Sequence, residues 1–245
     1  MKKSILYCGD DTLENGACYL FSIIKNSGYD IDYCPSNKRI NNNAISTNYD
    51  LYIFSDFPVK NIDYEMMEQI KENVKTGASF MMIGGWESFF GKDGEYLKTP
   101  FEDILPVNVL NKDDRLNYCQ GLVPVPVITD HAITRGLPWV KPPVICGCNI
   151  VKIKPNAETI MILKKIIIKN SLLQLDNSEI PYIATWKYGK GKTIAITSDF
   201  SPHWVGGMLD WGTKRRTLNI NKNISIEVGD YYIKFIQNLL KYVLC

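Results

Sequence analysis

Four short polar stretches of the sequence could do chemistry, and each one directly follows an apolar run. They are residues 8–11, 55–57, 84–88 and 198–204, which read CGDD, SDF, GGWES and SDFSPHW. In an open parallel sheet, ligands bind in the crevice at the carboxyl ends of the strands. The sequence therefore predicts one small-molecule site to which these strand ends contribute, although nothing in it identifies the ligand.

The stretch at residues 84–88 resembles the turn that presents a nucleophile. Gly84 and Gly85 break an apolar strand just before Trp86, and a sharp turn after a strand holds the nucleophile in many α/β enzymes. Tryptophan cannot attack a carbonyl, and Ser88 lies two residues beyond the turn. We expect Gly85, Trp86 and Ser88 to line a binding pocket. Glu87 is either a buried acid beside Trp86 or a helix N-terminal residue near free backbone amides.

A second chemical group is His203, which follows an apolar run with Asp199 four residues before it. A histidine can act as a general acid or base near neutral pH, and a carboxylate can orient it. His203, Asp199 and Glu87 are therefore the catalytic candidates. In the alternative interpretation, residues 201–204 form a structural turn in which His203 bonds to a backbone carbonyl.

Aromatic side chains gather near both stretches. They predict a wall for a flat or sugar-like ligand, although packing of the neighbouring segment on the sheet explains them equally well. The candidates for this wall are Trp86, Phe89, Phe90 and Trp204. Trp204 directly follows His203, so we expect it to line the same pocket.

The chain has seven cysteines, an odd number that favours reduced thiols over a disulfide framework. Cys146 and Cys148 form the only close pair, with no second pair at zinc-site spacing, so we expect no metal and no other cofactor. Cys8 ends the first predicted strand beside Asp10, which we expect to bind the ligand. Cys8 itself is either a displaced nucleophile within reach of His203 or a buried strand cysteine.

Alternating strand and helix patterns must position these groups. Such alternation implies right-handed crossovers between parallel strands, and so an α/β fold with a doubly wound, mostly parallel sheet flanked by helices. A closing amphipathic helix is predicted at residues 228–244. The earlier strands are predicted at residues 4–9, 29–34, 49–57 and 79–85, and the earlier helices at 12–28 and 63–77.

The rhythm changes between about residues 86 and 155, where prolines and short β-like pieces replace long helices. We interpret this segment as a β-rich insertion over one end of the sheet, within a single domain of residues 1–245. Strands return at residues 159–168 and 181–189, and the sequence GKG at 189–191 predicts a hairpin. The Asn-rich residues 36–48 are predicted to form a loop.

Six motifs occur in order along nearly the whole chain: GGWESFFGKDG, ILPV, HAITRGLPW, GCNIVKIKPNAETIMIL, YGKGKTIAITSDFSPHW and YIKFIQNLLKYVL. With this combination the sequence resembles the putative glutamine amidotransferase family of the class I glutamine amidotransferase-like superfamily. The resemblance implies a flavodoxin-like α/β fold. It does not by itself establish amidotransferase chemistry, because function depends on the site.

Working class I amidotransferases have a cysteine between glycines at the turn, and a histidine that takes its proton. This chain has Trp86 at that position and no cysteine between Cys34 and Cys119, whereas His203 stands where the superfamily has its catalytic histidine. The favoured hypothesis is therefore a non-catalytic module that binds an unknown small molecule. The alternative is a hydrolase or transferase that uses His203 with Asp199 and Glu87.

The amino-acid composition and net charge limit the classes of partner that we expect. Of the 245 residues, 45% are apolar and 22% are charged, which is ordinary for a soluble globular protein. The net charge of +2 gives no reason to expect a nucleic-acid partner. We see no signal peptide and no apolar run of the ~18–20 residues that span a bilayer, so we expect a cytoplasmic protein without membrane contact. Exposed aromatic residues at 86–155 predict a homodimer or higher homo-oligomer.

Overall fold

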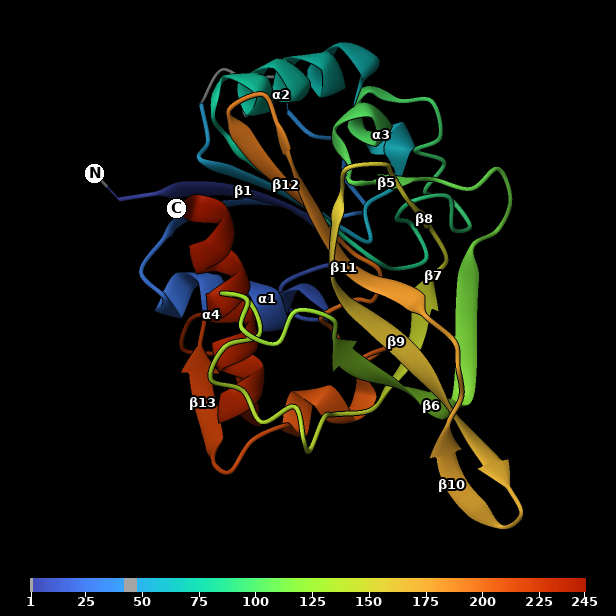
Figure 1. Cartoon of the computed structure of the whole chain (residues 1–245). Helices are drawn as coiled ribbons and strands as arrows, with labels where there is room; N and C mark the ends of the chain where they lie inside the picture. Colours follow the sequence, from blue (N-terminus) through green and yellow to red (C-terminus); the bar gives the residue numbers. More distant parts are fainter. Residues whose placement is uncertain (1, 42–47) are drawn as a thin grey trace.

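Ten strands form one central sheet in the computed structural model, which describes residues 2–41 and 48–245 (Figure 1). Residues 42–47 of the predicted Asn-rich loop lie outside the described part. The strands of the central sheet are β1 (Ser4–Gly9), β2 (Asp30–Cys34), β3 (Leu51–Ser55), β4 (Ser79–Ile83), β6 (Arg115–Pro126), β7 (Ile145–Asn149), β9 (Glu158–Lys169), β10 (Leu172–Leu175), β11 (Ile180–Tyr188) and β12 (Gly191–Ile196).

One half of this sheet is parallel, in the order β2-β1-β3-β4-β12. All residues of β3 and β4 are buried, as expected for parallel strands that are covered on both faces. The register aligns the strand ends Gly9, Ser55, Ile83 and Ile196. The residues that follow these four strands therefore leave the sheet at the same edge.

The other half is antiparallel and continues the order as β12-β11-β9-β6-β7, with β10 paired to β9. The predicted hairpin at residues 189–191 is confirmed, because Tyr188 of β11 pairs with Gly191 of β12. Strands β6 and β7 belong to the segment at 86–155, which the sequence predicts to lie over one end of the sheet. In the structure, these two strands extend the sheet itself.

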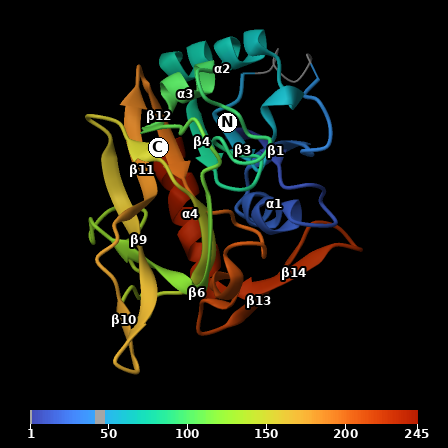
Figure 2. The same ribbon diagram turned by 90° about the vertical axis from the view of Figure 1, so that its right-hand side faces the viewer.

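Helices cover both faces of the sheet, which confirms the predicted α/β class (Figure 2). Ile5 and Tyr7 of β1 pack on the side of α1 (Ala17–Asn26) and α4 (Asp230–Leu244). Leu6 and Cys8 point to the opposite face and pack with α2 (Tyr64–Thr76) and α3 (Pro100–Ile104). This alternation follows from the two-residue period of a strand. The smaller elements are η2 (Val59–Asn61), η3 (Gly206–Asp210) and the paired strands β5 (Val107–Asn108) with β8 (Lys152–Ile153) and β13 (Arg215–Asn219) with β14 (Ser225–Gly229).

The helix ends agree with the sequence patterns, except at the start of α1. The pattern predicts a helix from residue 12, whereas α1 begins at Ala17, because residues 13–16 form a turn. Gly28 and Gly77 follow α1 and α2 with φ values of 89° and 137°, a conformation that glycine adopts most readily. Within the described ranges, no helix is long and apolar enough to cross a membrane.

Candidate functional site

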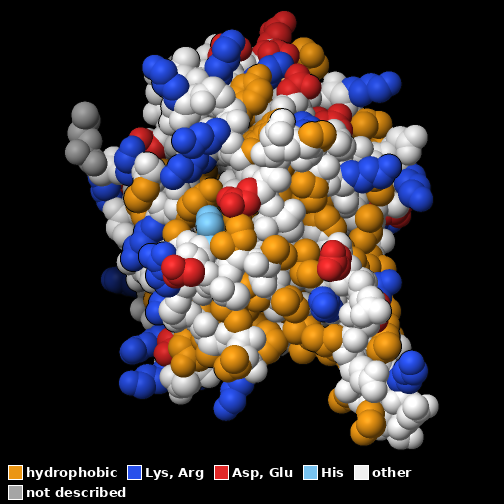
Figure 3. Space-filling model, viewed as in Figure 1, with side chains coloured by type: hydrophobic (Ala, Val, Ile, Leu, Met, Phe, Trp, Pro, Cys, Tyr) orange, Lys and Arg blue, Asp and Glu red, His pale blue; other side chains and the backbone are white. Residues whose placement is uncertain are grey.

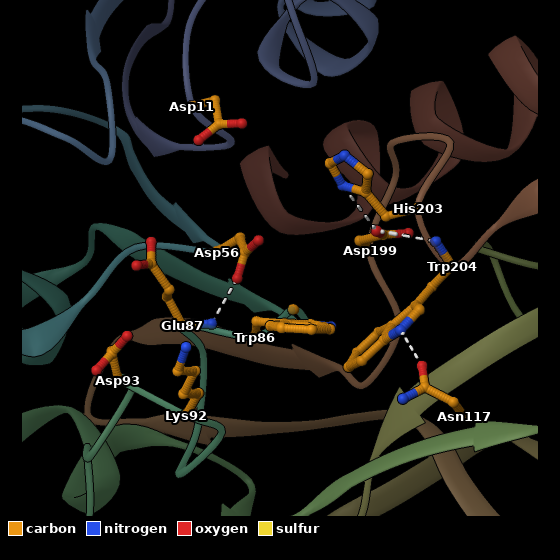
Figure 4. Close-up of a pocket in the computed structure, with 11 residues that line it drawn as sticks. Asp11, Asp56, Trp86, Glu87, Lys92, Asp93, Asn117, Asp199, His203 and Trp204 are labelled. Atoms are coloured by element: carbon orange, nitrogen blue, oxygen red, sulfur yellow. Dashed lines mark hydrogen bonds and ion pairs between the residues drawn. The ribbon is translucent and has the colours of Figure 1, made fainter.

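A pocket of about 510 Å³ opens at the carboxyl edge of the parallel strands (Figure 4). Its volume is typical of a site for a small molecule. Residues from the ends of β1, β3, β4 and β12 meet there, together with a residue of β6. The lining residues are Asp11, Asp56, Gly85, Trp86, Glu87, Lys92, Asp93, Asn117, Asp199, His203 and Trp204.

The turn after β4 is fixed by Asn149, the last residue of β7. The Asn149 side chain accepts a hydrogen bond from the Gly85 N–H at 3.0 Å and donates to the Gly85 carbonyl at 3.1 Å. The same amide donates to Asp114 at 2.7 Å. Both backbone polar groups of Gly85 are thus occupied by one buried side chain. A Cβ atom on Gly85 would lie 2.4 Å from the Asp56 carboxyl carbon, so only glycine fits this turn.

Asp56 and Ser88 join this turn to the end of β3. The Ser88 hydroxyl accepts a hydrogen bond from the Asp56 N–H at 2.9 Å and donates to the Ile83 carbonyl at 2.6 Å. In return, the Asp56 carboxylate accepts the N–H of Glu87. Ser88 is buried, and its hydroxyl makes both of these hydrogen bonds. Contrary to the sequence prediction, it does not line the pocket. Glu87 lies in this turn and not at a helix N-terminus.

The turn after β1 brings Asp11, and not Asp10, to the pocket. Gly9, Asp10 and Asp11 have φ values of 141°, 52° and 58°. This run of left-handed residues turns the Asp10 side chain inward, where it accepts a hydrogen bond from the buried Tyr7 hydroxyl. The expectation that Asp10 lines the pocket is therefore corrected. Its neighbour Asp11 is exposed at the rim.

His203 and Asp199 are connected through Ser201. The Ser201 hydroxyl donates to Asp199 at 3.1 Å and lies 3.1 Å from Nδ1 of His203. Asp199 also accepts the backbone N–H groups of Trp204 and Val205 at 3.2 and 3.1 Å. The buried carboxylate therefore holds the turn that carries His203, whose side chain is 60% exposed.

Two indole rings line the pocket. Trp86 is 48% exposed, and the Arg115 guanidinium lies 4.5 Å from its ring centroid. Trp204 is buried, packs over Gly147 and donates from Nε1 to Asn117 at 2.8 Å. Figure 4 shows Trp86 between Glu87 on one side and Trp204 on the other.

Two other aromatic residues do not join this wall. Phe89 is fully buried in the core on the side of α2, and Phe90 packs against the same cluster. The packing interpretation is therefore the correct one for Phe89 and Phe90. Phe89 has a φ value of 51°, which turns its side chain back under the sheet edge.

Carboxyl groups dominate the electrostatics of this edge. Burial, and after it the charge of Asp56, raises the pKa of Asp10 to about 7. Burial and the charges of Asp56 and Asp93 likewise raise the pKa of Glu87 to about 7. Burial is also the main cause that raises the pKa values of Asp56 and Asp199. Glu87 is therefore a carboxyl group of the pocket that can exchange protons near neutral pH.

Cys8 does not reach the pocket. It is fully buried in the core that α2 covers, and burial raises the pKa of its thiol well above the ordinary value. The prediction of a buried strand cysteine is confirmed, and the displaced-nucleophile interpretation is wrong. In the described part of the chain, no cluster of three or more His, Cys, Asp or Glu side chains could hold a metal ion.

Six residues named from the sequence do line the pocket: Gly85, Trp86, Glu87, Asp199, His203 and Trp204. Their proximity follows from the parallel strand order, and their roles stay predictions. Asp11 and Asp56 belong to the strand-end stretches that the sequence predicts to contribute to the site, but it gave neither residue a role of its own. No sequence pattern indicated that Asn117 and Asn149 belong to the site, because each lies within or at the end of an ordinary strand.

Solved structures of other proteins share the fold of this chain. The cytoplasmic protein STM3548 from Salmonella typhimurium is 24% identical, with 98% of each chain covered and a TM-score of 0.75. The cytoplasmic protein STM1381 from Salmonella typhimurium LT2 is 25% identical, with 98% of this chain and 99% of that chain covered and a TM-score of 0.75. A ThuA-like protein from Parabacteroides merdae is 13% identical over 100% of this chain and 90% of its own, with a TM-score of 0.58, which indicates a shared fold alone.

No curated protein matches the sequence. The family model described as putative glutamine amidotransferase matches residues 6–225. The match spans all the strand ends that build the pocket. The chain therefore belongs to the putative glutamine amidotransferase family.

Proposed function

We propose that this amidotransferase-like protein binds a small molecule in the strand-end pocket and does not carry out thiol-dependent amide transfer. One observation carries the proposal: the N–H of Glu87, the residue after the nucleophile position, donates to the Asp56 carboxylate. In nucleophile turns of this type, the N–H after the nucleophile stabilises the oxyanion of the reacting substrate. In this chain the Asp56 carboxylate accepts that N–H, so the N–H is not available to a substrate oxyanion.

The other parts of an acyl-transfer site are also missing from the described lining residues. No cysteine, serine or threonine is among them, and Trp86 stands at the nucleophile position. The Gly85 N–H, a further donor in the same turn, is bonded to Asn149. Neither a nucleophile nor a free donor pair is therefore available at the turn for a tetrahedral intermediate.

The lining favours a flat or sugar-like ligand. The exposed face of Trp86 offers an apolar platform, and the carboxylates of Asp11, Asp56 and Glu87 offer acceptors for hydroxyl or amino groups. The order β2-β1-β3-β4-β12 supports a flavodoxin-like arrangement, in which ligands bind at this edge. The two similar Salmonella proteins are named as cytoplasmic, which supports a cytoplasmic location for this chain.

Binding is tested by thermal shift and calorimetry with a panel of sugars, sugar acids, amino sugars and nucleosides. We expect at least one compound to raise the melting temperature of the native protein, and Trp86→Ala to remove that rise. Tyr64→Ala is the matched control, because Tyr64 is 59% exposed on α2 and lines none of the pocket. A rise that survives in Trp86→Ala would place the ligand elsewhere and contradict the proposal.

A second candidate function is a hydrolase or transferase that uses His203, Asp199 and Glu87. It rests on the raised pKa of Glu87, about 7, which suits a general acid, and on the His203 imidazole, which is 60% exposed and lines the same pocket. Compounds that bind are therefore incubated with native protein and with Glu87→Gln and His203→Asn variants. Turnover that is lost in both variants would favour this enzyme over the binding module.

A further inference from the structure

Cys8 and Cys34 stand opposite each other on the neighbouring parallel strands β1 and β2. Neighbouring strands are about 4.8 Å apart, which lies within the roughly 4.4–6.8 Å Cα separation of disulfides. Side chains that pair in register on neighbouring strands point to the same face of the sheet, so the two thiols lie side by side. They form a dithiol pair outside the strand-end pocket.

The two thiols have different environments. Cys8 is fully buried, whereas Cys34 is half-buried on the edge strand β2 and lines a separate cavity of about 460 Å³ with Lys38 and Arg39. Interaction with the neighbouring Cys8 thiol lowers the pKa of the Cys34 thiol against the opposing effect of burial, and the charge of Lys38 lowers it further. Cys34 is thus the more reactive thiol, and Cys8 is its buried neighbour.

We propose that Cys34 is an oxidation site for small peroxides and that Cys8 resolves it to a disulfide. The Cys34 thiolate attacks one peroxide oxygen, so that an S–O bond forms, the O–O bond breaks, and hydroxide leaves and takes up a proton. The Cys8 sulfur then attacks the resulting sulfenic acid; the S–S bond forms, the S–O bond breaks, and a second water leaves with the Cys8 proton. Two thiols are oxidised and one hydrogen peroxide is reduced to two waters.

The disulfide would act on the pocket through the residue beside Cys34. The Tyr33 hydroxyl donates to the carbonyls of Gly9 and Asp11 at 2.9 and 3.0 Å and so holds the turn that carries Asp11 to the pocket. A disulfide needs a Cβ separation of about 3.8 Å, which is less than the roughly 4.8 Å between neighbouring strands, so the bond would draw the edge strand toward β1. Oxidation therefore shifts Tyr33 and loosens this turn. The importance of that shift for ligand binding rests on the proposed function, whereas the oxidation itself does not.

The test uses the full chain with its three exposed cysteines replaced, so that their oxidation does not obscure the result. The replacements are Cys119→Ser, Cys146→Ser and Cys245→Ser. Reduced protein is treated with equimolar hydrogen peroxide, its intact mass is measured, and the sample is then alkylated for peptide mapping. We expect a loss of about 2 Da and a linked peptide that contains Cys8 and Cys34.

Variants and exchange measurements complete the experiment. Cys34→Ser should abolish the mass loss, Cys8→Ser should leave a sulfenic acid that dimedone traps at Cys34, and Cys18→Ser, which removes another buried thiol, should behave like its parent. Amide exchange at Asp10, whose N–H donates to Ser55 at 2.9 Å, should become faster in the oxidised protein. Both thiols remaining alkylatable, or a Cys34 adduct that never links to Cys8, would overturn the proposal. These readouts need no ligand, so they stand apart from the test of the proposed function.

Discussion

The carboxylate of Asp56, just past β3, accepts the backbone N–H of Glu87, just past β4. These two strands are neighbours in the sheet, so the contact closes the crevice between their ends. It also uses the one donor that a nucleophile turn would offer to an oxyanion. The turn keeps the shape of a catalytic site, but its hydrogen bonds are made within the protein.

The first prediction concerns glutamine chemistry. We expect no release of ammonia from glutamine and no labelling of any cysteine by a glutamine-mimicking electrophile, because Trp86 occupies the nucleophile position and Cys8 is fully buried. Ammonia is measured with a coupled assay in which a working amidotransferase is the positive control. Ammonia release by the native protein that disappears in Cys8→Ala would overturn this expectation.

A second prediction concerns the space at Gly85. Gly85→Ala should lower the free energy of unfolding by about 1–3 kcal/mol, because its Cβ would clash with the Asp56 side chain. Gly207→Ala is the matched control, since its Cβ would meet its nearest neighbour, the Val144 carbonyl, at 3.7 Å. Both are measured by chemical denaturation. Equal stabilities of the two variants would show that the turn relaxes around the new methyl group.

The buried hydroxyl of Ser88 provides a third prediction. Ser88→Ala leaves the Asp56 N–H and the Ile83 carbonyl without their partner, which should cost about 1–3 kcal/mol of unfolding free energy. Ser225→Ala, at an exposed position of β14, should change the stability by less than about 0.5 kcal/mol. Denaturant melts of the two variants give the comparison. If Ser88→Ala left the free energy of unfolding unchanged, water would have replaced the hydroxyl.

The fourth prediction is a pH dependence that Asp10 produces. Its folded-state pKa is about 7, above the unfolded value of ~3.9, so the folded protein binds more protons between these values. Its contribution to stability is therefore complete below about pH 4 and is lost as the pH rises toward 7, with a slope of up to about 1.4 kcal/mol per pH unit.

Asp10→Asn removes this titration and should flatten the stability profile between pH 5 and 7, measured by urea denaturation. Asp130→Asn is the control, because Asp130 is an exposed carboxylate whose side chain is 85% accessible. Parallel profiles for native protein and Asp10→Asn would show that the carboxyl of Asp10 does not titrate in this range.

The fifth prediction concerns assembly. The sequence predicts exposed aromatic residues at 86–155, but Trp86 is the only large aromatic exposed there in the described structure. The β9–β10 hairpin instead projects from the body with apolar side chains at its end, among them Ile168 and Leu173, which are 69% and 75% exposed (Figure 3). Among the strands of the described residues, β10 pairs only with β9, so it also presents an unpaired edge.

We therefore expect a homodimer or higher homo-oligomer in which this hairpin packs against a second copy of the chain. Leu173→Glu should lower the mass measured by light scattering, whereas Tyr64→Glu, at a 59% exposed site on α2, should not. A monomeric mass of the native protein at high concentration would contradict this prediction.

Local patterns were sufficient for most of the fold. Apolar runs that end in glycine or a polar residue predicted β1, β3 and β4, and the GKG turn predicted the β11–β12 hairpin. These elements are predictable because neighbouring residues set the backbone conformation there. The antiparallel extension by β6 and β7 was not foreseen. Its pairing with β9 joins segments about 40 residues apart, and such pairing leaves no local periodic signal.

The sequence by itself determined the family, the alternation of parallel strands with helices and the absence of a cysteine at Trp86, since residue identity and local periodicity suffice for these. Only the tertiary structure decided which side chains face the pocket. Left-handed conformations turn Asp10 inward and expose Asp11. Asn149 reaches Gly85 across 64 residues of sequence to occupy its backbone groups. Side-chain direction after a strand depends on a few backbone dihedrals and on distant partners, and neither is encoded in the local pattern.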